Sequence, residues 1–160
     1  MVNEQDIYQA LAAVSDPEVP VLSILDLGIV RQVSINENEV VITITPTYSG
    51  CPAMDVIATN IRMVLLSKGI KSIRIENQLS PAWTTDWMSF EGKKKLADYG
   101  IAPPTRKAKQ SLGLFEEDMV PCPKCGSHNT EMTSAFGATA CKSLYRCKGC
   151  LEPFEHFKCH

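Results

Sequence analysis

The sequence predicts an α+β protein with two parts: a small α-β-β-α-β domain with a mixed three-stranded sheet, and a C-terminal β module of the ribbon type. Three observations support this fold class. Apolar residues recur at helical spacing in two early segments, and β-branched runs occupy three others. Two CxxC pairs then follow near the end of the 160-residue chain.

The first helix is expected over residues 6–14, "DIYQALAAV", where Ile7, Leu11 and Val14 share one helical face. The next residues, "SDPEVP", contain two prolines. Because proline lacks a backbone N–H and clashes with the preceding turn, these residues end the helix.

Two strands and a second helix follow. The runs "GIVRQVSI" and "EVVITIT" are joined by "NENE", which predicts a hairpin. A helix is expected over about 52–68, ended by Gly69, and "IKSIRIE" reads as a third strand. A right-handed crossover through this helix would lay the third strand parallel to one of the first two.

The rest of the chain divides into a short helix, a linker and a module. The segment "LSPAWTTDWMS" carries two tryptophans, which are expected to cover the edge of a core, and a helix is expected over about 90–99. Prolines and charge clusters predict a linker at 101–119. The predicted domains are therefore 1–100, an α/β domain, and 120–160, a ribbon.

Composition excludes several classes of function. Residues 1–100 hold 8 basic and 12 acidic side chains, and residues 101–160 hold 8 and 6, so no strongly basic part exists. Nucleic acid is therefore not an expected partner. The start "MVNEQD" does not resemble a secretory signal, and "VPVLSILDLGIV" is short and contains Asp26, so no membrane partner is expected. The expected location is the cytoplasm.

The paired cysteines predict a metal site. Two residues between thiols let one tight turn direct both sulfur atoms at one ion, and two such turns complete a tetrahedral set. Zinc is favoured over iron because the ligand set is closed and the module is small. The predicted ligands are Cys122, Cys125, Cys147 and Cys150.

A second, weaker metal site is conceivable from Cys141, His156 and Cys159. Cys141 lies six residues before Cys147, too far along an extended strand to reach the same ion. Symmetry about the 147–150 turn would place Cys141 opposite His156. The alternative is a packed cysteine and a surface histidine.

Cys51, in "PTYSGCPAMD", is the candidate functional thiol. Pro52 suits the first helical position, which would make Cys51 the N-cap, where backbone N–H groups and the helix dipole would lower the thiol pKa. The alternative is a small buried cysteine. All three histidines lie in the tail, so no Cys–His pair is available within the first domain.

Two acidic turns precede the first strand and hold Asp16, Glu18 and Asp26. Their carboxylates could bond local backbone N–H groups as turn formers. If they lay near a thiolate, they could instead assist the handling of a metal or a cluster.

These residues resemble a known family. "DPEVPVLSILDLGIV" and "SGCP" are similar to the small iron–sulfur assembly domain of SufT-type bacterial proteins and the eukaryotic cytosolic targeting factor, over about residues 3–80. The run "SPAWTTDWMSFEGKKKLADYGIAPP" and the tail resemble one branch, PaaD (also called PaaJ), an accessory component of the phenylacetyl-CoA epoxidase system.

The resemblance implies a non-catalytic maturation factor rather than an enzyme. Such a factor would assemble or deliver an iron–sulfur cluster to the reductase of a di-iron monooxygenase that epoxidises phenylacetyl-CoA. It implies that Cys51 is the reactive or cluster-contacting thiol, and more weakly that Asp16, Glu18 and Asp26 support it. The alternatives are a structural subunit of that complex, a nucleic-acid-binding ribbon and a thiol enzyme.

Overall fold

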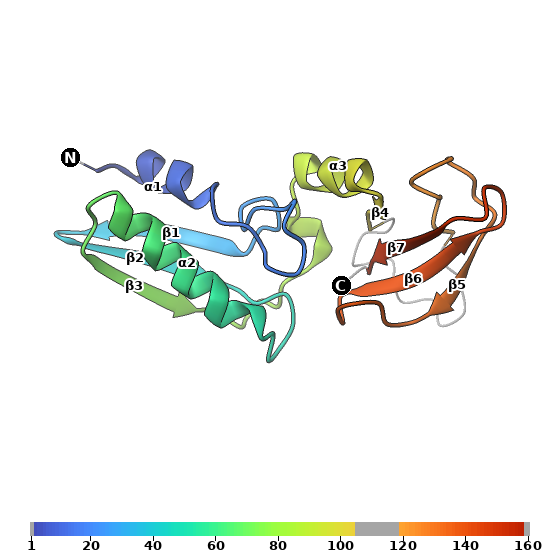
Figure 1. The fold of residues 1–160 in the computed structure, drawn as a ribbon. Helices are drawn as coiled ribbons and strands as arrows, with labels where there is room; N and C mark the ends of the chain where they lie inside the picture. Colours follow the sequence, from blue (N-terminus) through green and yellow to red (C-terminus); the bar gives the residue numbers. More distant parts are fainter. Residues whose placement is uncertain (1, 105–118, 159–160) are drawn as a thin grey trace. The chain divides into compact units, whose positions relative to one another are not determined.

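The computed structural model describes residues 2–104 and 119–158, which form two compact units (Figure 1). The first unit runs to Trp83 and includes Trp87–Ser89, and the second contains Thr84–Asp86 and the residues from Phe90 onward. The predicted boundary at residue 100 therefore differs from the observed one, because the helix over 90–99 groups with the second unit.

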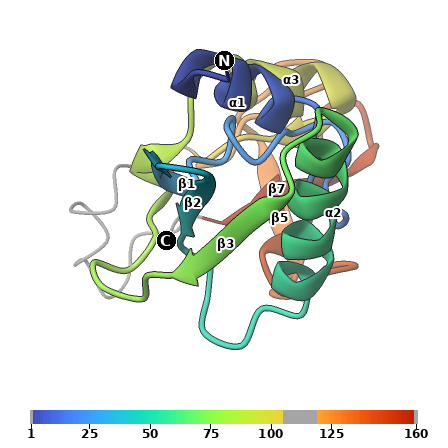
Figure 2. The same cartoon turned by 90° about the vertical axis from the view of Figure 1, so that its left-hand side faces the viewer.

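The first unit has the predicted α-β-β-α-β order. Its elements are α1 (Glu4–Leu11), β1 (Val30–Asn36), β2 (Glu39–Ile44), α2 (Ala53–Ser67) and β3 (Ser72–Asn77). The sheet has the strand order β1-β2-β3, with β1 antiparallel and β3 parallel to β2, so the mixed three-stranded sheet is confirmed. Both helices contact each other and the sheet, and they cover one of its faces (Figures 1 and 2).

Apolar periodicity explains this packing. The α2 side chains Ile57, Ile61 and Leu65 are all fully buried, as their spacing along one helical face requires. The central strand β2 is apolar on both faces, since Val41 and Ile42 are buried in succession.

Residues 79–89, which contain both tryptophans, contact the long segment between α1 and β1 and hold it in place. The indole N–H of Trp83 donates a 2.7 Å hydrogen bond to the carbonyl oxygen of Leu27. Gly28 has φ +72°, and a Cβ there would lie 2.3 Å from the carbonyl oxygen of Trp87. Arg31 stacks 3.7 Å from the centroid of the Trp87 ring. The two tryptophans therefore anchor the core edge, as predicted.

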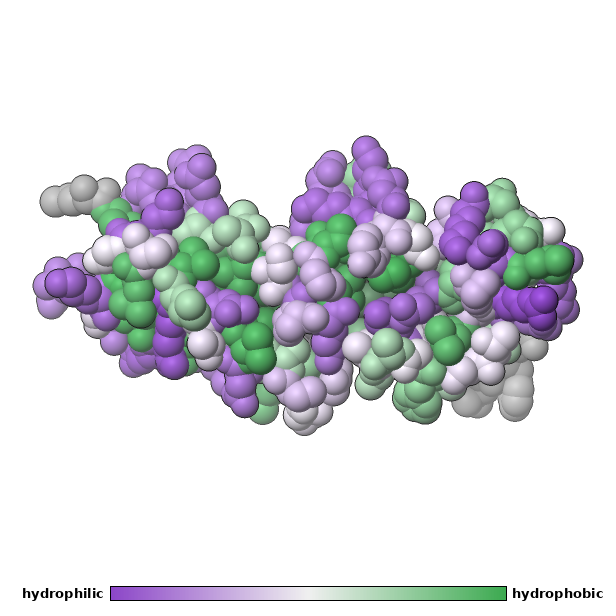
Figure 3. Space-filling model, viewed as in Figure 1, coloured by the Kyte–Doolittle hydropathy of each residue, from purple (hydrophilic) through white to green (hydrophobic). Residues whose placement is uncertain are grey.

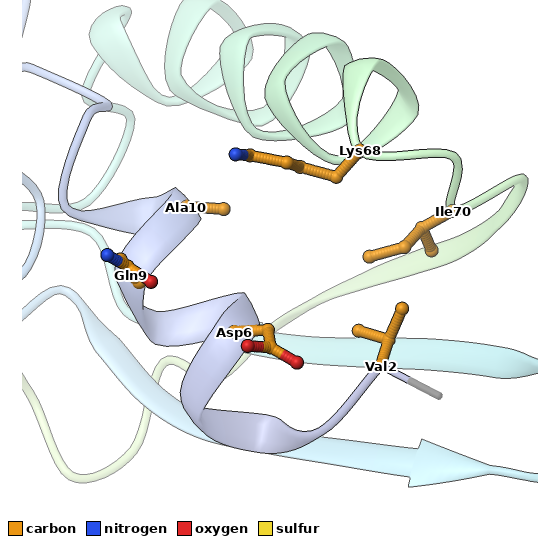
Figure 4. Close-up of a pocket in the computed structure, with 6 residues that line it drawn as sticks. All are labelled: Val2, Asp6, Gln9, Ala10, Lys68 and Ile70. Carbon is orange, nitrogen blue, oxygen red and sulfur yellow. The ribbon is translucent and has the colours of Figure 1, made fainter.

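A pocket of about 480 Å³ lies between α1 and the end of α2 (Figure 4). Asp6 lines it, but its carboxylate already accepts a hydrogen bond from the backbone N–H of Asn3 in the capping box of α1. No cysteine or histidine belongs to the pocket lining, so the pocket offers no thiol and no soft metal ligand.

The second unit contains α3 (Phe90–Tyr99) and a sheet of order β4-β7-β6-β5. The strands are β4 (Ile101–Ala102), β5 (Thr130–Ser134), β6 (Lys142–Cys147) and β7 (Pro153–Phe157). β4 pairs parallel with β7, so Ile101 and Ala102 are part of the sheet and the prediction that they begin a linker is wrong. The rest of the predicted linker lies mainly outside the described residues.

Among the described residues, no helix has the length and apolar character needed to cross a membrane.

Candidate functional site

Two knuckles of the second unit position four cysteines. In the first, the N–H of Gly126 donates to the carbonyl oxygen of Cys122 at 2.9 Å, and Gly126 has φ +74°. In the second, the N–H of Cys147 donates to the carbonyl oxygen of Glu152 at 3.0 Å and closes the turn between β6 and β7. Each CxxC pair thus forms the tight turn that its spacing predicts.

The four sulfur atoms are grouped as a metal site requires. The ligand atoms of Cys122, Cys125, Cys147 and Cys150 all lie within 4.8 Å of one another. The Cys122–Cys150 and Cys125–Cys147 sulfur distances are 3.8 and 3.5 Å. A tetrahedral zinc ion with Zn–S bonds of about 2.3 Å needs sulfur separations of roughly 3.8 Å. The four cysteines therefore fit zinc, with no position left for water or substrate.

The thiols differ in acidity. Backbone hydrogen bonding from the N–H of Cys150 is the main cause that lowers the pKa of Cys147, against burial, to about 6. The backbone N–H of Glu152 favours the Cys150 thiolate, but burial and hydrogen bonds with the neighbouring cysteines together raise the pKa of Cys150 to about 11. In the metal-free protein, Cys147 is therefore the first of the two to ionise, and a bound cation replaces the remaining thiol protons.

One side of this centre is open to solvent. Cys122 and Cys147 are buried, whereas Cys125 and Cys150 are exposed. Two exposed ion pairs flank the knuckles: Lys124 with Glu152 at 3.1 Å, and Lys148 with Glu131 at 3.2 Å.

The strand pairing around the predicted second metal site differs from the pairing that was expected. His156 pairs with Ser143, and the N–H of Lys158 donates to the carbonyl oxygen of Cys141, so Cys141 does not lie opposite His156. The turn includes Leu151 and Glu152 as well as 147–150, which moves the symmetry point along the hairpin. His156 is buried, so the alternative of a surface histidine is also wrong.

The thiol of Cys141 contacts the Thr139 hydroxyl at 3.0 Å, and the Cys141 side chain is buried. Cys159, the third predicted ligand, lies outside the described residues, so the second site stays a prediction.

Cys51 lies in the turn that enters α2. Its N–H donates to the carbonyl oxygen of Tyr48 at 3.2 Å, and Gly50 has φ +75° within that turn. The helix begins at Ala53 with Pro52 as the N-cap, so the prediction that Cys51 is the N-cap is wrong by one residue. Proline takes that position because it has no N–H to leave unpaired.

The Cys51 thiol is half-buried, between the fully buried and the freely exposed alternatives. The hydroxyl of Thr47 approaches its sulfur at 3.9 Å, within reach of a weak hydrogen bond. Sequence reasoning missed this contact, although a threonine four residues before the cysteine was visible.

The acidic residues serve the turns first. Asp16 is buried, and its carboxylate accepts hydrogen bonds from the N–H groups of Glu18 at 2.7 Å and Val19 at 2.9 Å. Asp26 accepts from the N–H of Ser23 at 3.0 Å and from the Ser89 hydroxyl at 3.3 Å. These bonds confirm the interpretation of both aspartates as turn formers.

Within the described ranges, the four ribbon cysteines are the only group of three or more potential metal ligands with closely spaced ligand atoms. No such group includes the candidate residues of the first unit, which are Cys51, Asp16, Glu18 and Asp26. The first unit therefore presents a single thiol rather than a set of clustered metal ligands.

Comparison with known proteins places each unit in a family. Residues 4–76 match the family described as iron–sulfur cluster assembly protein, and residues 106–158 match the PaaD zinc β-ribbon domain. The chain is also 46% identical to an Escherichia coli protein provisionally named as one of the subunits of 1,2-phenylacetyl-CoA epoxidase. That alignment spans 96% of this chain and 92% of the relative. The chain belongs to the PaaD family.

Further relatives of this PaaD-family chain match the first unit. An iron–sulfur protein maturation auxiliary factor of Porphyromonas gingivalis is 39% identical over 58% of this chain and 90% of its own length. The crystal structure of a domain of unknown function, DUF59, from Bacillus anthracis has a TM-score of 0.55 and 34% identity, covering 58% of this chain and 90% of that one. The PaaD-family chain thus joins an iron–sulfur assembly domain to a zinc ribbon.

Proposed function

We propose that this protein is a non-catalytic accessory factor of a phenylacetyl-CoA epoxidase system, which assembles or delivers an iron–sulfur cluster to the reductase component. One observation carries the proposal. The chain resembles a protein of the epoxidase along nearly its whole length, while its first unit alone resembles maturation factors. A cytoplasmic location is part of the proposal.

Cys51 is the residue proposed to handle the cluster. A half-buried thiol at an element boundary can reach a ligand while its backbone is held by the Tyr48–Cys51 turn. Thiolate is the protein ligand that iron–sulfur clusters use most. A single thiolate leaves the other iron positions for the client, which suits transient binding better than storage.

Asp16 and Asp26 act through the backbone in this proposal. Asp16 closes the turn that contains Glu18, and Asp26 links the segment before β1 to Ser89. We propose that these two aspartates hold the loops of the first unit in place. Glu18 is half-buried, whereas Asp16 and Asp26 are buried, so its carboxylate is the more accessible of the three.

The ribbon is proposed to bind zinc through Cys122, Cys125, Cys147 and Cys150 as a structural ion. A closed four-sulfur shell offers no open coordination position, so the ion supplies folding free energy rather than chemistry.

A maturation assay tests the proposal. Cluster-free reductase is incubated with iron, sulfide and the purified protein, and cluster content is followed by visible absorbance and acid-labile sulfide. We expect Cys51→Ser to abolish the acceleration of loading. We expect Cys141→Ser, which removes a buried thiol of the second unit, to preserve it. Loading by the Cys51→Ser variant at the wild-type rate would contradict the proposal.

A second candidate is a structural component of the epoxidase complex, which the name of the Escherichia coli relative favours. It predicts stoichiometric co-purification with the oxygenase components and no effect of Cys51→Ser on epoxidase activity. It also predicts that an epoxidase reconstituted with cluster-loaded reductase is inactive without this chain. A maturation factor, in contrast, is dispensable once the reductase already holds its cluster.

A further inference from the structure

The loop that follows α1 and the middle of α2 line a pocket of about 420 Å³ in the first unit. Polar and apolar side chains are interspersed over the face on which α2 lies in Figure 1 and which Figure 3 colours by hydropathy, so surface composition alone does not single this pocket out. Its chemistry does, because one buried charge lies among apolar walls. The lining includes Asp16, Pro17, Pro20, Asn60, Met63 and Val64.

Asp16 carries the charge of this pocket. The residue is 7% exposed, and its Oδ1 accepts the N–H groups of Glu18 at 2.7 Å and Val19 at 2.9 Å. Within the described ranges, its Oδ2 accepts no hydrogen bond, and no lysine, arginine or histidine forms an ion pair with it. A buried charge normally has a counter-ion. The described part of the chain supplies none for Asp16, so Oδ2 is left for a cation from outside.

The α2 side of the pocket adds a second acceptor and an apolar surface. Asn60 is half-buried, and its side-chain amide forms no hydrogen bond with any residue that the structure describes. Its oxygen and Oδ2 of Asp16 come from different elements, so together they suit a group with several N–H donors. Met63 is 63% exposed at the pocket, and Pro17 and Pro20 are exposed on the loop side. These side chains suit an aliphatic stem.

The lining decides between classes of ligand. Its described residues include no lysine, arginine or histidine, so a phosphate or carboxylate has nothing to pair with. A metal ion is disfavoured, because Asp16 belongs to no group of three closely spaced ligands in the described ranges. Among organic cations, a guanidinium is planar, weakly hydrated and rich in donors, whereas an ammonium is compact and strongly hydrated. The arginine stem can lie on apolar walls while its head group reaches both acceptors.

We propose that the pocket between the Asp16 turn and α2 binds an arginine side chain of a partner protein, with the guanidinium paired to Oδ2 of Asp16 and hydrogen-bonded to the amide oxygen of Asn60. Charge complementarity selects this occupant. Residues 1–100 hold 12 acidic and 8 basic side chains, so the first unit as a whole also attracts a cationic partner. Asp16 thus has two roles: Oδ1 closes its turn, and Oδ2 recognises the partner.

The test titrates the full-length, zinc-loaded chain with N-acetyl-arginine methylamide and follows amide resonances by NMR. The signals of Glu18 and Val19 report on the site, because their N–H groups donate to Asp16. We expect them to shift in a saturable way. N-acetyl-citrulline methylamide, which keeps the stem and loses the charge, should bind at least fivefold more weakly. N-acetyl-lysine methylamide should also bind more weakly than the arginine compound.

Three variants locate the site. Asp16→Asn keeps an oxygen for the two N–H donors of the turn and removes the charge, so Kd for the arginine compound should rise at least fivefold. Asn60→Leu leaves the turn intact and should raise Kd at least threefold, which keeps the test decisive if Asp16→Asn folds poorly. Asp55→Asn is the matched control, since it removes the same charge from an exposed position of α2, and its Kd should stay within twofold of wild type.

Absence of saturable shifts, equal binding of the citrulline compound, or smaller changes of Kd in Asp16→Asn and Asn60→Leu than those stated would overturn the proposal. Binding of the lysine compound as tight as that of the arginine compound would overturn the choice of arginine. The inference goes beyond the proposed function and does not rest on it, because the probes involve neither Cys51 nor a cluster. A failure here therefore leaves the maturation assay unaffected, and normal loading by Cys51→Ser would leave the pocket assignment unaffected.

Discussion

Trp83 and Leu27 are joined by a 2.7 Å hydrogen bond from the indole N–H to the backbone carbonyl, across 56 residues of sequence. The bond is buried and links the segment after β3 to the segment before β1. It therefore holds together the part of the first unit that carries Asp26 and Gly28.

Replacing Trp83 with phenylalanine should destabilise the first unit. The aromatic volume is largely kept, but the buried carbonyl of Leu27 loses its partner, which costs about 1–3 kcal/mol. Urea unfolding measures the change. Trp87→Phe is the control; it alters the Arg31 stacking at a less buried ring and should cost under about 1 kcal/mol.

Gly28→Ala should destabilise far more than Gly50→Ala, although both glycines have nearly the same φ, +72° and +75°. Alanine in the left-handed region costs about 1–2 kcal/mol at either position. At Gly28 the Cβ would also meet the Trp87 carbonyl oxygen at 2.3 Å, adding roughly 1–3 kcal/mol, whereas open space surrounds Gly50. Equal unfolding free energies for the two variants would contradict the packing described here.

Removal of the metal should unfold the second unit and spare the first. The second unit has a small apolar core, so its folding depends on the metal. Chelation or Cys125→Ser should abolish one cooperative transition in calorimetry and leave the other in place. Cys141→Ser should hold the same amount of zinc per chain as wild type, namely one ion; less zinc in the variant than in wild type would instead support the second site.

Metal binding should weaken as the pH is lowered, because zinc competes with protons for the four sulfur atoms. In the metal-free protein, backbone hydrogen bonding lowers the pKa of Cys147 to about 6 from an ordinary value of 9.0, so protons compete less well for this sulfur than for an ordinary thiol. The contribution of this thiolate to folding is complete above pH 9 and is lost as the pH falls from 9 through about 6. A chromogenic chelator titration from pH 8 to pH 4 measures release, and zinc held unchanged at pH 4 would refute this assignment.

The metal ligands could be predicted because the two-residue spacing is a local property. A CxxC turn directs both sulfur atoms to the same side whatever surrounds it, so Cys122 and Cys125 indicate a site before any fold is known. The register around Cys141 could not be predicted in this way, since it depends on whether Leu151 and Glu152 belong to the turn.

The environment of Cys51 was only half predictable. Glycine before the cysteine and proline after it indicate a turn entering a helix, and the structure has that turn. The helix begins at Ala53 rather than at Pro52, and local sequence does not fix a helix boundary to a single residue. The Thr47 hydroxyl near the sulfur is a tertiary detail of the loop.

The sequence by itself determined the periodic elements of the first unit and the four-cysteine spacing, because both depend on interactions between residues close along the chain. Only the tertiary structure decided that Ile101 and Ala102 join the ribbon sheet, that Trp83 anchors Leu27, and that Leu151 is exposed in a left-handed turn. Those features depend on pairings between distant segments and on which side chains the core leaves uncovered, and neither is encoded in local periodicity.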